Sequence, residues 1–142
     1  MQAAIIGVDF GTTYSGFAFA RVDAPDDIRI EENWPGQQQA TGSVYQKTKT
    51  CVLYKDGELV SWGWEAEMAA LDMKQKEFKS SSAQLLEKFK LCLAEGKPNA
   101  PNLPAGVSVE DVIQHYLKGI STLAKQRYQE AFGMVSAHTI RW

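Results

Sequence analysis

The sequence predicts an α/β fold in which a mixed sheet, begun by an antiparallel meander, packs against helices. The first observation is residues 5–31, where short apolar or alternating runs are separated by turn residues, as in paired strands. The second is residues 108–133, whose apolar positions recur at the spacing of a long amphipathic helix. A length of 142 residues suits one domain with a real core.

Residues 5–20 predict a strand, a tight turn and a returning strand, and Asp9 ends the first of these strands, which is otherwise suited to burial. A buried carboxylate is costly unless a cation or a hydrogen-bond donor meets it. Gly11 allows a backbone conformation that other residues resist, so the amides after it can converge on one point. Converging amides bind anions, and the hydroxyls of Thr12 and Thr13 add donors there. With an Asp that could hold Mg²⁺ through water, this is half of a nucleotide site.

A plainer interpretation of the same turn stays open at this point. Gly-Thr-Thr turns are common in hairpins, and an Asp before a Gly often only fixes a turn. Short motifs of this kind also match by chance. The apolar strands on both sides favour the nucleotide interpretation.

The meander continues beyond the hairpin. Asp26-Asp27 predicts a turn, and residues 28–31 alternate with period two, as in a third strand. Residues 33–36 then end the strand, and the polar stretch 37–43 is interpreted as a loop.

A second hairpin and a helix follow. Residues 51–54 and 59–62 are short apolar strands around Asp56-Gly57, which is a strong hairpin signal. From Trp64 onward the pattern changes to that of a helix.

The last part of the chain predicts two more helices and a final strand. Residues 80–93 have apolar side chains spaced for one buried helical face, whereas residues 95–106 contain three prolines and predict a loop. Ser108 begins the longest helix and Gly133 ends it, with residues 137–142 opening another strand. The apolar positions of these two helices are Leu85, Leu86, Phe89 and Leu93, then Val109, Val112, Ile113, Tyr116, Leu117, Ile120, Leu123 and Ala124.

Composition excludes several classes of function. A net charge of -2 gives no electrostatic reason to expect nucleic acid or an acidic membrane as a partner. Cys51 and Cys92 lie too far apart for a metal-binding pair and suit a reducing compartment. The sequence has no secretory signal pattern and no apolar run long enough for a membrane helix, so we expect a soluble, cytoplasmic protein.

Four other residues invite a functional interpretation but predict structural roles. His115 and His138 have no carboxylate or cysteine at metal-ligand spacing. Trp62 and Trp64 could form a stacking platform for a base, but core packing is the favoured interpretation.

Residues 6–15, Ile-Gly-Val-Asp-Phe-Gly-Thr-Thr-Tyr-Ser, resemble the first phosphate-binding motif of the superfamily of actin, sugar kinases and heat-shock chaperone ATPases. The Thr-Thr-Tyr-Ser ending is most similar to the DnaK-type, seventy-kilodalton heat-shock proteins. Residues 60–66, 87–91 and 140–142 are similar in order and spacing to the divergent, heat shock protein 12A-like branch of that family. The resemblance implies a ribonuclease-H-like, actin-like ATPase fold, of which residues 1–142 would form the N-terminal part, an incomplete first lobe.

The resemblance also implies roles for individual residues. Asp9 would act in catalysis by orienting the water shell of Mg²⁺. Lys90 aligns best with a lysine that reaches the γ-phosphate and the attacking water, and Lys88 is the second choice. Composition alone favours a solvated lysine on an amphipathic helix, so that alternative stays open. The residues implied in binding ATP are Gly11, Thr12, Thr13 and Tyr14, the last three through main-chain amides to the β- and γ-phosphates.

The implied function is that of the ATP-binding portion of a heat-shock chaperone-like ATPase, with ATP, ADP and Mg²⁺ as ligands. Client proteins and co-chaperones would bind regions outside these residues. The second phosphate loop of the family, of the Asp-Gly-Gly-Gly-Thr type, is absent, since the sequence contains no Gly-Gly pair, and so is the adenosine motif. We therefore expect weak nucleotide binding and no hydrolysis by this chain alone.

Two other functions stay open. A lobe of a sugar or glycerol kinase shares the Asp-x-Gly-Thr-Thr hairpin, but such kinases usually carry a basic residue soon after the threonines. Here Tyr14, Ser15 and Gly16 follow, which favours the chaperone branch. The other alternative is a non-enzymatic, truncated remnant that only binds partners.

Overall fold

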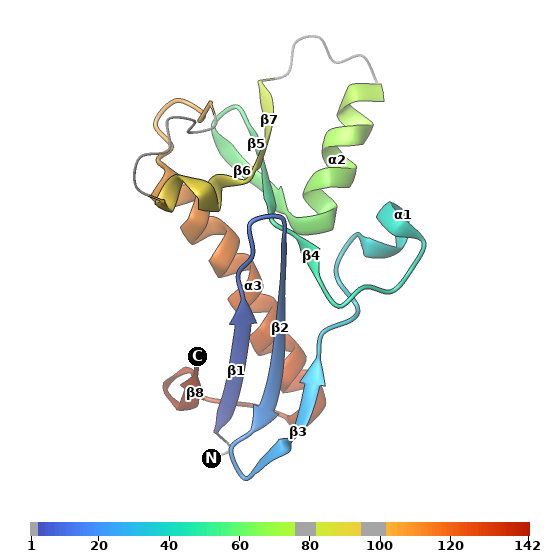
Figure 1. The fold of residues 1–142 in the computed structure, drawn as a ribbon, viewed down its shortest axis with the longest axis vertical. Coiled ribbons are helices and arrows are strands. Elements are labelled where there is room, and N and C mark those ends of the chain that lie inside the picture. Colours follow the sequence, from blue (N-terminus) through green and yellow to red (C-terminus); the bar gives the residue numbers. More distant parts are fainter. Residues whose placement is uncertain (1–2, 76–81, 95–101) are drawn as a thin grey trace.

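The computed structural model describes residues 3–75, 82–94 and 102–142. Figure 1 shows an elongated molecule with one sheet at its lower end and a smaller sheet above it. The long helix α3 (Val109–Phe132) runs behind the larger sheet in this view, and it contacts strands of both sheets. The predicted α/β class with packed helices is confirmed.

The larger sheet holds the first hairpin. Its strands β1 (Ala4–Asp9), β2 (Tyr14–Arg21), β3 (Ala24–Ile30) and β8 (Ile140–Arg141) lie in the order β3-β2-β1-β8. The short strand β4 (Thr48–Lys49) also pairs with β2. Because β1–β2 and β2–β3 are antiparallel while β1–β8 is parallel, the sheet is mixed and opens with a meander, as predicted.

The smaller sheet has the order β6-β5-β7, formed by β6 (Glu58–Trp62), β5 (Cys51–Lys55) and β7 (Ala83–Glu87). Asp56 and Gly57 connect β5 to β6 with φ angles of 52° and 82°. Both angles are left-handed, as a two-residue hairpin turn requires. The second predicted hairpin is therefore confirmed.

The helix predicted over residues 80–93 is wrong within the described residues, which begin again at Ser82. Strand β7 pairs with β5 along its whole length, with Leu86 opposite Val52, so cross-strand pairing overrides the helical spacing. Lys88, with a φ of 57°, ends the strand and leads into a short 3₁₀ helix, η1 (Phe89–Leu93).

Two smaller predictions are also wrong. Asp26 and Asp27 lie inside β3, because Arg21 pairs with Ala24 and the turn therefore falls before them. The stretch interpreted as a loop contains a short helix, α1 (Gln37–Thr41).

The remaining helices follow their sequence signals. Helix α2 (Gly63–Gln75) begins beside Trp64, and a short 3₁₀ helix, η2 (Ala137–Thr139), precedes β8. At the start of α3, Ser108 Oγ accepts a hydrogen bond from Asp111 N at 3.1 Å, and Ser108 N donates to Asp111 Oδ2 at 2.9 Å. This capping box confirms the predicted start of the helix, and Gly133 caps its end. Residues 102–107 contain no helix or strand, and the rest of the predicted loop, 95–101, lies outside the described residues.

The core lies between the sheets and the buried face of α3, which carries Val112, Tyr116, Ile120, Leu123, Ala124 and Tyr128. Trp64 and the half-buried Trp62 belong to it, which confirms their predicted packing role. Nδ1 of His115 and Oη of Tyr54 lie 2.6 Å apart and share a hydrogen bond, which gives His115 a structural contact.

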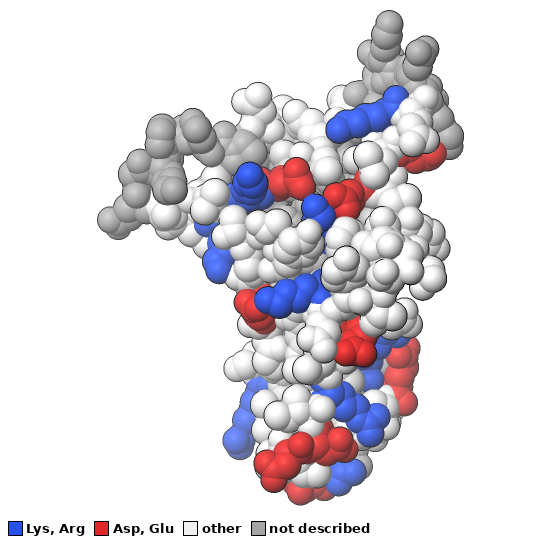
Figure 2. Space-filling view, turned by 45° about the vertical axis from the view of Figure 1, so that its right-hand side comes forward, with Lys and Arg blue, Asp and Glu red and all other residues white. Residues whose placement is uncertain are grey.

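Among the described residues no helix is long and apolar enough to cross a membrane. On the face drawn in Figure 2, acidic and basic residues are interspersed.

Replacing Gly119 by Ala is expected to destabilise the fold. A Cβ at this position of α3 would lie 2.6 Å from Cε2 and Nε1 of the Trp62 indole, a rigid ring in the core. Overpacking of this kind costs about 1–3 kcal/mol, which exceeds the gain of about 0.8–1 kcal/mol from the helix propensity of Ala. Urea unfolding followed by circular dichroism measures the difference. Thr122→Ala, at an exposed position of the same helix, is the control and should unfold within about 0.5 kcal/mol of the wild type.

Candidate functional site

The turn between β1 and β2 is held in one shape by Gly11. Asp9 and Gly16 form the last pair of the hairpin, so residues 10–13 make the connection. A Cβ on Gly11 would lie 2.0 Å from the carbonyl oxygen of Tyr14. Gly11 is not among the described glycines with left-handed φ angles. The glycine is therefore required by space inside the turn rather than by the backbone freedom that the sequence suggested.

The turn leaves main-chain donors available. The amide of Gly11 donates to Ser15 Oγ at 3.1 Å, and the carbonyl of Thr13 accepts from Thr50 N at 2.8 Å. Within the described part of the chain, the amides and hydroxyls of Thr12 and Thr13 make no hydrogen bond. Tyr14 begins β2, where it pairs with Lys49 of β4. Two unpaired amides and two hydroxyls at one bend form a set of donors suited to an anion.

Buried hydroxyl groups lie next to the turn and hydrogen-bond with one another or with the main chain. Ser15 is fully buried and its Oγ lies 2.7 Å from Thr50 Oγ1. Beside them, Tyr116 Oη donates to the carbonyl of Lys49 at 2.9 Å. Burial raises the pKa of Tyr116 to about 12, so this hydroxyl stays protonated at neutral pH. None of these contacts was predicted, because they join residues 35 to 67 positions apart.

Lys90 reaches this turn from the other half of the chain. Its Nζ donates to the main-chain carbonyl of Phe10 and lies 5.2 Å from the centroid of the Phe10 ring. Phe89, beside it in η1, is fully buried and anchors the segment. Lys88 is exposed, and its side chain makes no hydrogen bond or ion pair with the residues described. The structure therefore brings together Lys90, the first choice from the sequence, and the predicted hairpin.

Asp9 lies at the exposed end of β1. Its side chain is 62% exposed, although earlier residues of the strand, Ala4 and Ile6, are buried. It does meet a cation, since Lys47 Nζ lies 2.6 Å from Asp9 Oδ2. Sequence reasoning missed Lys47, because the two residues are 38 positions apart and no local pattern links them.

Lys49 adds a third cation near the hairpin. Its Nζ lies 5.4 Å from the ring centroid of Tyr14 and 3.1 Å from Glu67 Oε1 of α2. Burial acts to lower the pKa of Lys49, but the hydrogen bond and charge of Glu67 outweigh it and raise the pKa. Lys49 is thus protonated, and the carboxylate of Glu67 already balances its charge.

The side chains around Asp9 suit a divalent cation only when a ligand brings further oxygen atoms. No group of three or more His, Cys, Asp or Glu side chains among the described residues could hold a metal. Mg²⁺, however, usually keeps several waters and binds through one or two carboxylates plus the phosphates of a ligand. Asp9 alone therefore suits a Mg²⁺ ion that arrives with phosphates, and Lys47 contacts Oδ2 of the same carboxylate.

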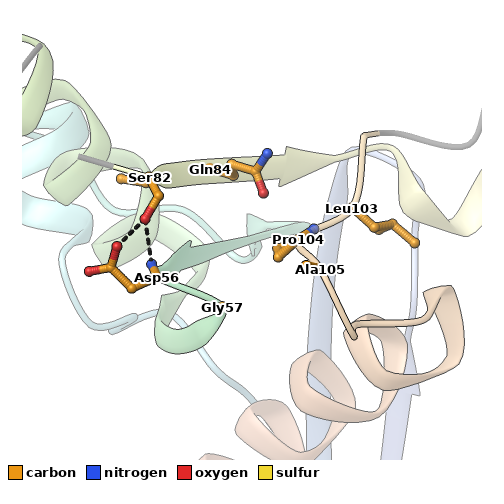
Figure 3. Close-up of a pocket in the computed structure, with 8 residues that line it drawn as sticks. Asp56, Gly57, Ser82, Gln84, Leu103, Pro104 and Ala105 are labelled. Carbon is orange, nitrogen blue, oxygen red and sulfur yellow. Dashed lines mark hydrogen bonds between the residues drawn. The ribbon is translucent and has the colours of Figure 1, made fainter. Parts of the chain in front are cut away.

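The hollows in the surface differ in chemistry. A groove of about 350 Å³ beside the hairpin is lined by Asp9, Gln46, Lys47 and apolar residues of the larger sheet. A second hollow, of about 540 Å³, lies at the β5–β6 turn (Figure 3). There Ser82 Oγ accepts from Asp56 N at 3.0 Å and also bonds the Asp56 carboxylate. Its described lining carries no Lys or Arg, so it does not suit a phosphate, and the hairpin remains the candidate site.

Comparison with known proteins identifies relatives of one kind. The chain is 28% identical to human heat shock 70 kDa protein 12B over 150 residues, covering 97% of this chain and 21% of that protein. It is 33% identical to human heat shock 70 kDa protein 12A and 32% identical to the mouse protein over 90 residues, covering 63% of this chain and 13% of each relative. The chain thus spans about a fifth or less of the length of these relatives. No protein-family profile and no solved structure matches it.

Gly11→Ala is expected to distort the turn, because the new Cβ must displace the Tyr14 carbonyl. We expect a loss of about 1–3 kcal/mol in unfolding free energy and shifted amide resonances for residues 12–14. Urea unfolding and ¹H–¹⁵N correlation spectra measure the two effects. Gly7→Ala is the matched control, since a Cβ there meets nothing within 4 Å on the same hairpin. Equal effects of the two substitutions would contradict the spatial role of Gly11.

Proposed function

This chain is a homologue of the heat shock 70 kDa proteins 12A and 12B, as its resemblance indicated, and from this we propose that the β1–β2 turn binds the phosphates of ATP with Mg²⁺. In this proposal residues 1–142 form the N-terminal part, an incomplete first lobe, of an actin-like ATPase domain of the ribonuclease-H-like type. The mixed α/β fold with its opening meander is compatible with that assignment.

The observation that carries the proposal is the contact of Lys90 with the turn. A lysine 80 positions away donates to the carbonyl of Phe10, beside the unpaired amides of Thr12 and Thr13. A cation and main-chain donors at one point are what the oxygens of a phosphate require. The contact depends on the fold and not on local sequence, so it supports the predicted site independently of the motif.

Each residue would then act on the ligand in a specific way. The amides of Thr12, Thr13 and Tyr14 would donate to the β- and γ-phosphates, and Gly11 keeps the turn tight enough for them to converge. Lys90 would exchange the Phe10 carbonyl for a γ-phosphate oxygen. Asp9 would hold Mg²⁺ through its water shell, and the ion would neutralise charge on the phosphates.

We assign these residues binding, not hydrolysis. Phosphoryl transfer needs donors and cations on all sides of the transferred group, and the sequence has no second, Gly-Gly-containing phosphate loop. A cytoplasmic heat-shock role, with client proteins and co-chaperones as partners, belongs to the proposal for the protein family as a whole. The relatives' names support the heat-shock part of that proposal.

The Lys90→Met variant tests the proposal. Titration calorimetry of the full chain with Mg²⁺ and ATP should show affinity about tenfold below the wild type, equivalent to about 1.4 kcal/mol. The loss should be smaller for ADP, which lacks the γ-phosphate. Lys88→Met is the matched control, because this neighbouring lysine is exposed and makes no side-chain contact with the described residues. It should bind ATP within about twofold of the wild type.

Three results would count against the proposal. A wild-type chain that binds neither ATP nor ADP would leave no phosphate site at the turn. An equal loss of ATP affinity in Lys88→Met and Lys90→Met would remove the specific role of Lys90. Binding that responds to added glycerol or a sugar, with release of ADP, would favour the kinase alternative.

A further inference from the structure

The ion pair between Lys47 and Asp9 is not a chance meeting of two surface side chains. The main chain of Lys47 is held by the core, because its carbonyl accepts a hydrogen bond from the buried Trp64 through Nε1 at 3.2 Å. The next residue, Thr48, pairs with Ser15 of β2 and accepts from Trp64 N at 3.2 Å. These contacts at Lys47 and Thr48 fix where the Lys47 side chain starts.

The hairpin also leaves room for that side chain. A Cβ on Gly16, the residue opposite Asp9, would lie 3.3 Å from Lys47 Cγ and 2.9 Å from the carbonyl oxygen of Gln46. The stem of Lys47 thus crosses the hairpin at a glycine before its Nζ reaches Asp9 Oδ2 at 2.6 Å. The same pair of strands that presents the carboxylate accommodates the lysine.

The pair is easy to break. The two side chains are 50% and 62% exposed, and an ion pair in water at this exposure contributes only about 0–1 kcal/mol. An arriving divalent cation competes with the ammonium group for the charge of the same carboxylate. An arriving phosphate instead finds the charge of Asp9 already balanced by Lys47, while Lys90 supplies a cation at the Phe10 carbonyl.

We propose that Lys47 is a built-in counter-ion that takes the place of a divalent cation at Asp9, so that phosphate chains bind the turn with little dependence on metal. Lys47 contacts Oδ2 of Asp9, so this carboxylate carries a cation before any metal arrives. This inference rests on the proposed phosphate site, and it concerns which cation balances the charge of Asp9 there.

The test measures metal dependence rather than affinity alone. Inorganic tripolyphosphate and ATP are titrated into the full chain by calorimetry, once with EDTA and once with excess Mg²⁺. The ratio of the two dissociation constants should stay within about threefold for the wild type. In Lys47→Met, binding without metal should weaken about tenfold while binding with Mg²⁺ changes little, so the ratio rises about tenfold. Lys47→Arg, which keeps the charge, should restore the wild-type ratio.

The outcomes separate this inference from the function it rests on. If the wild type binds both probes but depends on Mg²⁺ by tenfold or more, or if Lys47→Met keeps the wild-type ratio, the counter-ion role is wrong and the phosphate site stands. If the wild type binds neither probe in either buffer, the phosphate site itself fails and this inference fails with it. Melting temperatures of the variants should match the wild type, because the side chain of Lys47 is half exposed.

Discussion

The ring of Tyr116 is the contact on which the assembly of the candidate site depends. It is fully buried on α3, and its centroid lies 5.7 Å from Trp62, 5.7 Å from Phe89 and 5.8 Å from Phe10. These neighbours come from β6, η1 and the first turn, three segments far apart in the sequence. Since Phe89 precedes Lys90, burying one ring brings Lys90 to the turn that follows Asp9. Each aromatic pair contributes about 0.5–1.5 kcal/mol beyond its buried area.

The elements that the sequence predicted well have their signals within a few residues. Asp56-Gly57 defines a turn by backbone conformation alone, and Ser108 and Asp111 cap their helix through bonds three positions apart. The helix predicted around Leu86 is wrong because the apolar spacing there suits a helix, while the strand partner of Leu86, Val52, lies in another part of the chain. Pairing across that distance is a tertiary effect, which periodicity does not contain.

The candidate site likewise contains residues with local sequence signals and residues that only tertiary contacts bring in. The hairpin with Asp9 was predictable from its motif, and Lys90 only through a family resemblance. Lys47 was missed entirely, because nothing near it in the sequence points to a carboxylate 38 positions earlier. The pairing of Ser15 with Thr50 was missed for the same reason, although Ser15 lies inside the motif. Local chemistry thus indicated the donors of the turn and the resemblance indicated Lys90, while Lys47 and the buried hydroxyl pair required the fold.

Helix α3 has a mechanical consequence. Its 24 residues form a rod about 36 Å long that packs against strands of both sheets. Arg127, near one end, donates hydrogen bonds to Glu31 and to the carbonyl of Asn33. Tyr116, in the other half of the helix, packs against Trp62 of the smaller sheet. Bending one sheet relative to the other would have to break this rod or strip its buried face. Helix α3 thus couples the two sheets, and Lys47 and Lys90 are the side chains that a ligand at the turn would meet.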